Sequence, residues 1–316
     1  MKQVFIDGSA GTTGLRIVER LESRNDLSLI RLPEAMRKDP AARKEAINKA
    51  DLVFLCLPDD AARESVALLE NPNTVLLDTS TAHRTQPGWL YGFPEINPQI
   101  AKAMPAAQKI AVPGCHASGF IALIAPLLSG GILSPDVLLT CTSVTGYSGG
   151  GKSMIAQYQS PEGFPLLLAP RQYGLSQTHK HLKEMQAITG LHYPPAFSPI
   201  VSNFYSGMCV TIPLFSAQLA PGKTIHHIKE AYAASYTGPM VSFVDQADEA
   251  GFLSAAALSG SDRMELSVFG NDDRILLAAR YDNLGKGASG AAIECMNLCL
   301  GLDPTTGLTL SSEKEN

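Results

Sequence analysis

Hydrophobic positions in the first third of the chain form short apolar runs, separated by segments with a helical period. After the run at residues 3–6, apolar side chains recur at Leu15, Ile17, Val18 and Leu21, which a helix places along one face. Short buried strands that alternate with helices predict an α/β fold with a parallel, doubly wound sheet. The expected strands are residues 3–6, 27–32, 52–57 and 74–78, and the expected helices are residues 14–24, 41–49 and 61–69.

Beyond Cys115 the pattern changes to alternating apolar and polar residues, with more Thr and Ser. Such alternation is typical of strands with one covered face, so we expect a second, α+β domain with a mixed or antiparallel sheet. A helix at 117–128 is expected to precede strands at 137–145, 208–217, 240–244, 264–269 and 274–282. A last helix at 290–300 is expected to pack back on the first domain, and the polar segment after Pro304 to fray.

Composition narrows the class of protein. A chain of 316 residues with 45% hydrophobic and 17% charged residues is long enough for two domains and too apolar to be disordered. The net charge of -5 and the lack of a long Lys/Arg run argue against a nucleic-acid partner. The six cysteines form no C-x-x-C pair, and we find no signal peptide and no apolar run of roughly 18 residues. We therefore expect a cytoplasmic protein with reduced thiols and no membrane segment.

The turn between the first strand and the first helix is rich in glycine, with the sequence Asp7-Gly8-Ser9-Ala10-Gly11-Thr12-Thr13-Gly14. Glycines here permit tight backbone angles and let main-chain amides approach a pyrophosphate at the helix N-terminus. We interpret Gly8, Gly11, Thr12, Thr13 and Gly14 as a Rossmann-like nucleotide-binding loop, although the glycine spacing is G-x-x-G-x-x-G. The alternative is a tight turn that needs glycine for packing alone.

The residues after the second strand bear on which nicotinamide cofactor is bound. An acidic residue at this point favours NAD, because it holds the ribose hydroxyls. Arg31, Arg37 and Lys38 are instead suited to accept a 2′-phosphate, which favours NADP, while the nearby Glu34 keeps NAD open.

Cys115 follows a Pro-Gly turn and directly precedes the expected helix at 117–128. The N-terminus of a helix stabilises negative charge and can lower the pKa of a thiol. The other five cysteines lie within expected strands or helices and are interpreted as small core residues. Cys115 is therefore the candidate nucleophile, with a purely structural cysteine as the alternative.

Two histidines, His179 and His181, are candidates for the acid–base partner of this thiolate. Their imidazoles lie on one side if the segment is extended and on different faces if it is helical. Two imidazoles can also bind a metal ion, but no third ligand follows at a suitable spacing, so no metal site is expected.

A second glycine-rich segment, Gly146-Tyr147-Ser148-Gly149-Gly150-Gly151-Lys152-Ser153, matches the G-x-x-x-x-G-K-[ST] pattern of triphosphate loops. It raises the alternative of an ATPase or kinase, which would leave Cys115 without a role. We favour a smaller anion, the phosphate or oxyanion of a substrate, held by Lys152 and main-chain amides. A redox-sensing NADP-binding regulator that uses Cys115 as a switch is a further alternative, but a second anion-binding loop favours a phosphorylated substrate.

Ordered blocks through nearly the whole chain carry a family resemblance. They are Phe5-Ile6-Asp7-Gly8, Thr12-Thr13-Gly14-Leu15, Asp78-Thr79-Ser80-Thr81-Ala82-His83-Arg84, Tyr91-Gly92-Phe93-Pro94-Glu95, Pro113-Gly114-Cys115, Thr145-Gly146-Tyr147-Ser148-Gly149, Thr178-His179-Lys180-His181 and Asp282-Asn283-Leu284-Gly285-Lys286-Gly287. With these blocks the chain resembles the short-type N-acetyl-γ-glutamyl-phosphate reductases of arginine biosynthesis, relatives of aspartate-semialdehyde dehydrogenase.

The resemblance implies an NADP-binding domain, residues 1–115 and 286–316, and a catalytic domain, residues 116–285, in a homo-oligomer (a dimer or tetramer). It implies NADPH as cofactor, with Ser80 and Asn283 near it. Cys115 corresponds to the nucleophile, which forms a thioester with the acyl group of the substrate.

The resemblance also implies that Arg84, Ser148 and Lys152 bind the phosphate or carboxylate of the substrate. The segment His179-Lys180-His181-Leu182-Lys183-Glu184 is similar to the H-R-H-x-P-E segment of the long-type enzymes but lacks its proline. Either His179 or His181 is therefore the acid–base candidate. Another acyl phosphate, such as aspartyl phosphate, is the alternative substrate.

Overall fold

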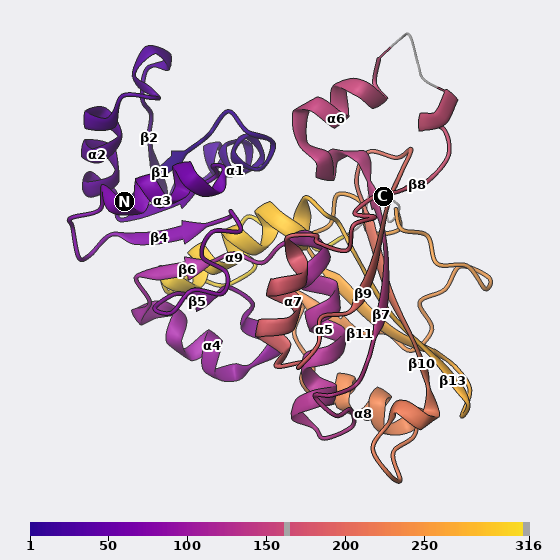
Figure 1. Ribbon diagram of the computed structural model, residues 1–316. Coiled ribbons are helices and arrows are strands. Elements are labelled where there is room, and N and C mark those ends of the chain that lie inside the picture. Colours follow the sequence, from indigo (N-terminus) through magenta and orange to yellow (C-terminus); the bar gives the residue numbers. More distant parts are fainter. Residues whose placement is uncertain (161–164, 312–316) are drawn as a thin grey trace. The chain divides into compact units, whose positions relative to one another are not determined.

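The computed structural model describes residues 1–160 and 165–311, so residues 312–316 lie outside the described residues. The segment after Pro304 was predicted to fray, but as far as residue 311 it is held in place: Leu308 packs on the core of the first unit, and the Thr309 amide donates to Asp262 at 2.8 Å. The chain divides into two compact units. The first consists of Met1–Gly114 and Ala288–Leu308, and the second consists of Cys115–Gly287 together with the residues from Thr309 onward. Figure 1 follows the chain through both units.

The first unit is built on a parallel sheet, as the apolar runs predicted. Its strands are β1 (Lys2–Asp7), β2 (Leu27–Ile30), β3 (Leu52–Leu55), β4 (Val75–Asp78), β5 (Leu90–Tyr91) and β6 (Lys109–Ala111). They lie in the order β2-β1-β3-β4-β6-β5, and each pair of neighbours is parallel. The direction of winding reverses between β1 and β3, and a doubly wound sheet binds its ligand beyond the carboxyl ends of the strands at such a reversal.

Helices cover both faces of this sheet. They are α1 (Thr12–Glu22), α2 (Pro40–Lys49), α3 (Asp59–Ala67), α4 (Pro98–Ala103) and α9 (Gly290–Cys299). Side chains of β1 point alternately to the two faces, so Val4 and Ile6 pack with α1 and α9, while Phe5 packs with α2. The C-terminal helix therefore returns to the first unit, as its apolar pattern predicted.

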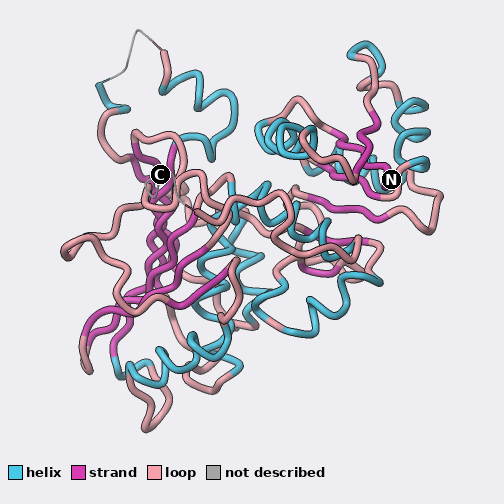
Figure 2. Tube along the Cα trace, turned by 180° about the vertical axis from the view of Figure 1, so that it is seen from behind, coloured by secondary structure: helices cyan, strands magenta, loops and turns pink. Residues whose placement is uncertain are grey.

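The second unit contains the mixed sheet that the alternating runs predicted. Its strands lie in the order β11-β12-β13-β10-β7-β9-β8, with parallel pairing of β7 with β9 and of β11 with β12. The bounds are β7 (Thr140–Gly146), β8 (Arg171–Gln172), β9 (Ala196–Ser202), β10 (Met208–Phe215), β11 (Val241–Phe243), β12 (Met264–Gly270) and β13 (Arg274–Tyr281). Figure 2 shows these strands as magenta segments of the tube.

The helices of this unit are α5 (Cys115–Ser129), α6 (Gly151–Tyr158), α7 (His181–Thr189) and α8 (Ile225–Ser235). α5 contacts β10 and β13, α8 contacts β11 and β12, and α7 packs on α5. α5 begins at Cys115 itself, two residues earlier than the apolar pattern suggested. Within the described residues, no helix combines the length and the hydropathy that crossing a membrane requires.

Candidate active site

The glycine-rich loop after β1 is shaped by two of its three glycines. Gly8 has φ +87°, and a Cβ there would lie 2.3 Å from the carbonyl oxygen of Cys56. A Cβ on Gly14 would lie 2.4 Å from the carbonyl oxygen of Gly8, whereas one on Gly11 would meet nothing closer than 3.5 Å. Side chains are therefore excluded at the first and third glycines, and Gly11 serves as the N-cap of α1.

The same loop leaves the amino end of α1 at the carboxyl edge of the sheet. Thr12 and Thr13 are the first two residues of that helix, and the Gly11 amide closes the turn on the Gly8 carbonyl at 3.0 Å. The first amides of a helix lack intrahelical partners and attract anions. The residues predicted from sequence thus fit the pyrophosphate of a dinucleotide.

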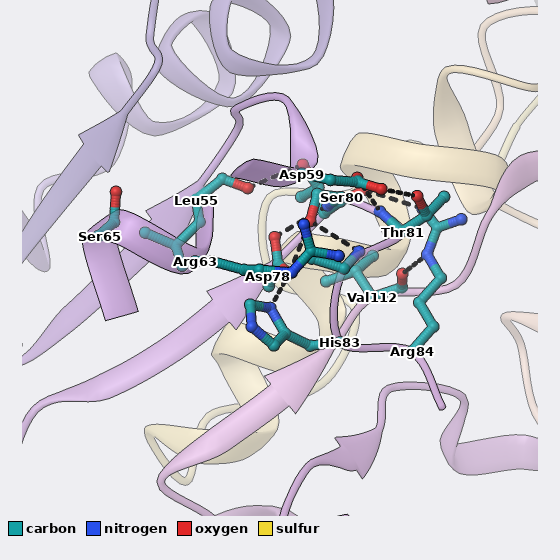
Figure 3. A network of polar contacts seen from close by, with 12 residues as sticks. Leu55, Asp59, Arg63, Ser65, Asp78, Ser80, Thr81, His83, Arg84 and Val112 are labelled. Atoms are coloured by element: carbon teal, nitrogen blue, oxygen red, sulfur yellow. Dashed lines mark hydrogen bonds and ion pairs between the residues drawn. The ribbon is translucent and has the colours of Figure 1, made fainter. Parts of the chain in front are cut away.

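A buried polar network fixes the segment after β4 (Figure 3). The Asp78 carboxylate accepts hydrogen bonds from the amide and the hydroxyl of Ser80, at 2.9 and 2.8 Å, and its Oδ2 lies 2.6 Å from His83 Nδ1. The imidazole of His83 in turn stacks on Trp89, with ring centroids 4.1 Å apart. Ser80, a predicted cofactor contact, is therefore held at the same edge of the parallel sheet as the glycine loop.

Arg84 lies in this network, and two of its donors go to main-chain carbonyls (Figure 3). Nε donates to Val112 at 2.9 Å and Nη2 to Thr79 at 2.8 Å. The residue is 8% exposed. Arg84 therefore braces the end of β4 against the segment that leads to Cys115, a role that sequence reasoning did not assign to it.

Cys115 is the first residue of α5 and is partly exposed. Partial exposure alone does not set it apart, since Cys56 and Cys299 are also partly exposed. Burial nevertheless raises the pKa of Cys56 to about 12 and that of Cys209 to about 11. Those thiols stay protonated near neutral pH, whereas Cys115 has the helix N-terminus that favours a thiolate.

The end of β13 and the turn after it pack against Cys115. The Tyr281 hydroxyl donates to the Cys115 carbonyl at 2.5 Å and accepts a hydrogen bond from the Gly119 amide at 3.0 Å. A Cβ on Gly287 would lie 3.1 Å from the Cys115 Cβ. The family block at 282–287 thus forms one wall around the candidate nucleophile, and the preceding Tyr281, which sequence reasoning missed, touches its peptide.

Three imidazoles converge in the same unit, those of His116, His179 and His181. Their ring centroids lie 5.7 Å (116 to 179), 5.5 Å (116 to 181) and 4.9 Å (179 to 181) apart. The segment at residues 179–181 is neither wholly extended nor wholly helical, since His179 precedes α7 and His181 is the first residue of that helix. Among the described residues, no three His, Cys, Asp or Glu side chains are placed to hold a metal ion.

His116 lies in the interior of this cluster. Its Nδ1 is 2.7 Å from the Ser143 hydroxyl, and its Nε2 is 2.6 Å from the Tyr173 hydroxyl. Burial, followed by the charges of His179 and Lys180, lowers the pKa of His116 to about 3, so the imidazole is neutral. Sequence reasoning gave His116 no role and did not identify Ser143 or Tyr173.

Tyr173 joins the cluster of imidazoles through its hydrogen bond to His116. Burial and then the charge of Cys115 raise the pKa of its phenol. The phenol therefore stays protonated, with His116 as its hydrogen-bond partner and the nucleophile nearby. No spacing rule on the sequence links residue 173 with 115.

His179 differs from His181 in exposure and hydrogen bonding. His181 is 4% exposed, while His179 is only partly shielded from solvent. The His181 amide donates to Nδ1 of His179 at 3.3 Å, which leaves the proton of a neutral His179 ring on Nε2. Burial, and after it the charge of Lys180, lowers the pKa of His179.

A glutamine just before the histidines, which sequence reasoning also missed, anchors them to β9. Gln177 has φ 57°, a backbone conformation rare outside glycine. Its Nε2 donates to the Phe197 carbonyl at 2.7 Å, and its Oε1 accepts the Phe197 amide at 2.8 Å. The Phe197 ring packs 5.3 Å from His179 and 5.4 Å from His116 between centroids.

The second glycine-rich segment follows β7 but does not present its first amides to a phosphate chain. The amides of residues 146–148 donate to main-chain carbonyls of residues 204–207 over 2.9–3.0 Å. The Ser148 hydroxyl accepts from Asn283 Nδ2 at 2.9 Å, and Asn283 Oδ1 accepts the Gly207 amide at 2.9 Å. Ser148 and Asn283, predicted to bind different ligands, are therefore partners, and Lys152 is exposed at the start of α6.

Two protein families match segments that lie in the first and in the second unit. Residues 115–283 match the family described as semialdehyde dehydrogenase, dimerisation domain. Residues 33–104 match the family described as semialdehyde dehydrogenase, NAD binding domain.

Several curated proteins are similar over almost the full chain. The N-acetyl-gamma-glutamyl-phosphate reductase 2 of Nostoc sp. is 43% identical, over 97% of this chain and 99% of its own length. The N-acetyl-gamma-glutamyl-phosphate reductase 2 of Pseudomonas putida is 44% identical, over 94% and 96%. The N-acetyl-gamma-glutamyl-phosphate reductase of Rhizobium meliloti is 45% identical, over 94% and 98%.

Solved structures share the fold at low sequence identity. Aspartate semialdehyde dehydrogenase II from Vibrio cholerae, complexed with ASA, has a TM-score of 0.72 at 15% identity, over 95% of this chain and 98% of that one. Aspartate semialdehyde dehydrogenase with NADP from Candida albicans has a TM-score of 0.67 at 15% identity, over 94% and 98%.

Proposed function

We propose a function for this chain from its family: it belongs to the N-acetyl-gamma-glutamyl-phosphate reductases of the semialdehyde dehydrogenase family. The proposed reaction reduces N-acetyl-gamma-glutamyl phosphate to N-acetylglutamate semialdehyde and phosphate, in arginine biosynthesis. The observation that carries the proposal is the placement of Cys115, the partly exposed first residue of α5. The imidazoles of His116, His179 and His181 lie in the same unit.

The reaction begins with attack of the Cys115 thiolate on the carbonyl carbon of the acyl phosphate. The C–S bond forms, and the C–O bond to phosphate breaks with its electron pair on the phosphate oxygen. The amides at the amino end of α5 stabilise the charge on the carbonyl oxygen during this step. The product is a thioester on Cys115, protected from the direct hydrolysis to which the acyl phosphate is prone.

NADPH is the cofactor, and when bound it supplies the hydride that reduces the thioester carbonyl. Gly8 and Gly14 keep the loop tight by admitting main-chain contacts that a Cβ would block, and the tight loop leaves the amides at the amino end of α1 to bind its pyrophosphate. The exposed Arg37 and Lys38 suit a 2′-phosphate. Ser80 and Asn283 are further cofactor contacts.

His179 shuttles a proton during the second step. Addition of hydride gives a thiohemiacetal oxyanion on Cys115. His179 protonates this oxyanion and takes the proton back as the C–S bond breaks, which releases the aldehyde and returns the thiolate. His179 suits this role better than the buried His181, because it is open enough to take up a proton from solvent and return it. His181 supports it through the main-chain bond to Nδ1.

Lys152 and Ser148 bind the charged ends of the substrate. Lys152 is exposed at the start of α6, directly after the segment that holds Ser148. Arg84 contributes by bracing the segment before Cys115 more than by direct contact, since two of its donors are already engaged.

The first unit serves as the NADP-binding domain and the second as the catalytic domain. The chain works as a homo-oligomer, a dimer or tetramer, through its dimerisation domain. On β10 the exposed Pro213 and Phe215 alternate with buried residues, so one face of the sheet offers apolar surface to another copy. The six thiols are all free, which suits the reducing cytoplasm.

The test compares two aldehydes and two cysteine variants. Phosphate-dependent reduction of NADP should be far faster with N-acetylglutamate semialdehyde than with aspartate semialdehyde, and the reverse preference would favour the alternative substrate.

Cys115→Ser should keep NADPH binding and lose more than about 100-fold in turnover, roughly 2.7 kcal/mol of transition-state stabilisation. Cys299→Ser, a partly exposed thiol of the first unit, is the control and should keep the wild-type rate. Turnover above a hundredth of wild type in Cys115→Ser would rule out the thioester.

A further inference from the structure

The Tyr281 hydroxyl contacts both main-chain groups that close the first turn of α5. In a helix the amide of residue i bonds directly to the carbonyl of residue i−4. At the start of α5 the corresponding pair is the Gly119 amide and the Cys115 carbonyl. The Tyr281 hydroxyl accepts from that amide at 3.0 Å and donates to that carbonyl at 2.5 Å. A side chain from β13 thus bridges the turn that presents the candidate nucleophile.

The surrounding residues are shaped to admit this hydroxyl. A Cβ on Gly119 would lie 2.7 Å from the Tyr281 hydroxyl oxygen and 2.8 Å from its ring carbon Cε1. Gly287 makes a similar approach to Cys115 from the turn after β13. Glycine at 119 is therefore a requirement of the bridge, because any larger residue would displace the ring or the helix.

The chemistry of the phenol keeps the bridge intact. Tyr281 is fully buried. Burial, with a smaller contribution from the charge of Cys115, raises the pKa of Tyr281 well above its ordinary value. The hydroxyl therefore keeps its proton near neutral pH and remains the donor to the Cys115 carbonyl.

We propose that Tyr281 is a positioning residue for Cys115, an inference that rests on the proposed function. The bridge fixes the peptide of Cys115 and thereby sets the direction of its thiol and of the first amides of α5. If the hydroxyl is removed, the first turn of α5 keeps its helical conformation but loses its anchor to β13. The protein then keeps its fold, but the nucleophile shifts. A displacement of this kind reduces the rate of attack far more than it reduces substrate binding.

The chain offers matched controls on the same helix. The Tyr236 hydroxyl donates to the Ala122 carbonyl and the Tyr232 hydroxyl to the Leu123 carbonyl, both at 2.6 Å. Both tyrosines are buried, and both carbonyls belong to α5, well past its first turn. Replacing either by Phe deletes the same type of hydrogen bond without touching Cys115.

The experiment measures kcat and KM for Tyr281→Phe, Tyr236→Phe and Tyr232→Phe in the full-length protein. We expect kcat of Tyr281→Phe to fall by about 10- to 100-fold with KM within about threefold of wild type, and both controls to keep kcat within about twofold. An equal loss of kcat in the controls would overturn the proposal, because the effect would then belong to the packing of α5. So would a wild-type kcat in Tyr281→Phe.

A second readout does not depend on reductase activity. The rate at which iodoacetamide alkylates Cys115, followed against pH, reports the reactivity of the thiol alone. This profile should change in Tyr281→Phe and in Gly119→Ala, which displaces the hydroxyl without deleting it, and should stay as in wild type in Tyr236→Phe. An unchanged profile in both test variants would refute the positioning role. If the wild type alkylates normally but lacks reductase activity, the proposed function fails and this measurement still decides the role of Tyr281.

Discussion

Acidification from about pH 7.5 to about pH 5 should destabilise the second unit through the imidazole of His116. Its pKa is lowered to about 3 in the folded protein, because the ring is buried and, in second place, because the charges of His179 and Lys180 oppose its protonation. In the unfolded chain the pKa returns to about 6.5, so unfolding takes up a proton below that pH. The contribution of His116 to the free energy of unfolding is complete above about pH 6.5 and declines as the pH falls below this value. At pH 5 the loss is about 2 kcal/mol, from roughly 1.5 pH units at about 1.4 kcal/mol each.

Urea unfolding of the wild type and of His116→Gln, at several pH values between about 5 and 7.5, tests this magnitude. The free energy of unfolding should fall less steeply with acid in the variant, by about 2 kcal/mol over the range. His226→Gln is the control for the loss of a histidine that is exposed at the surface. Parallel curves for wild type and His116→Gln would refute the reasoning, since they would mean that His116 takes up no proton on unfolding.

Two further predictions concern the predicted binding residues. Gly8→Ala should raise the Kd for NADPH at least about tenfold in a fluorescence titration, because its Cβ would meet the Cys56 carbonyl at 2.3 Å in a left-handed backbone. Gly11→Ala should raise the Kd less, because φ is -74° there and the new Cβ would meet no protein atom closer than 3.5 Å. Equal Kd values for the two variants would contradict this account of the loop. Lys152→Ala should raise KM for the acyl phosphate about tenfold and leave the Kd for NADPH and the melting temperature unchanged, since the side chain is exposed. An unchanged KM in steady-state assays would remove Lys152 from the substrate site.

The sequence predicted the elements of the fold wherever burial and period agree. The continuous apolar runs of β1 and β3 are strands because each buries both faces between helices, and that signal is local. β9 was missed because Pro199 interrupts its alternation. Pro199 lacks an amide, and β9 nonetheless pairs with β7 on one side and with the short β8 on the other.

The sequence identified some of the candidate catalytic residues and not others, for a similar reason. Cys115 was identifiable because its signal, a Pro-Gly turn before a helix, is local. The environment of His116 was not, because its partners come from β7, from the residue after β8 and from β9. Such a cluster exists only once the sheet has formed, and no spacing on the chain encodes it. The proposal of His179 over His181 likewise depends on their burial, which no spacing on the chain encodes.

The second glycine-rich segment matches a triphosphate motif at every position and still presents a different surface. A triphosphate loop works because consecutive amides remain free to point at phosphate oxygens. Here the amides of residues 146–148 are hydrogen-bonded to residues 204–207, a pairing that local sequence does not reveal. The same pairing places Ser148 beside Asn283 and leaves Lys152 exposed at the start of α6. A hydroxyl and one mobile ammonium group suit a single phosphate or carboxylate better than a chain of three phosphates. The segment therefore fits an acyl-phosphate substrate in the unit that carries Cys115.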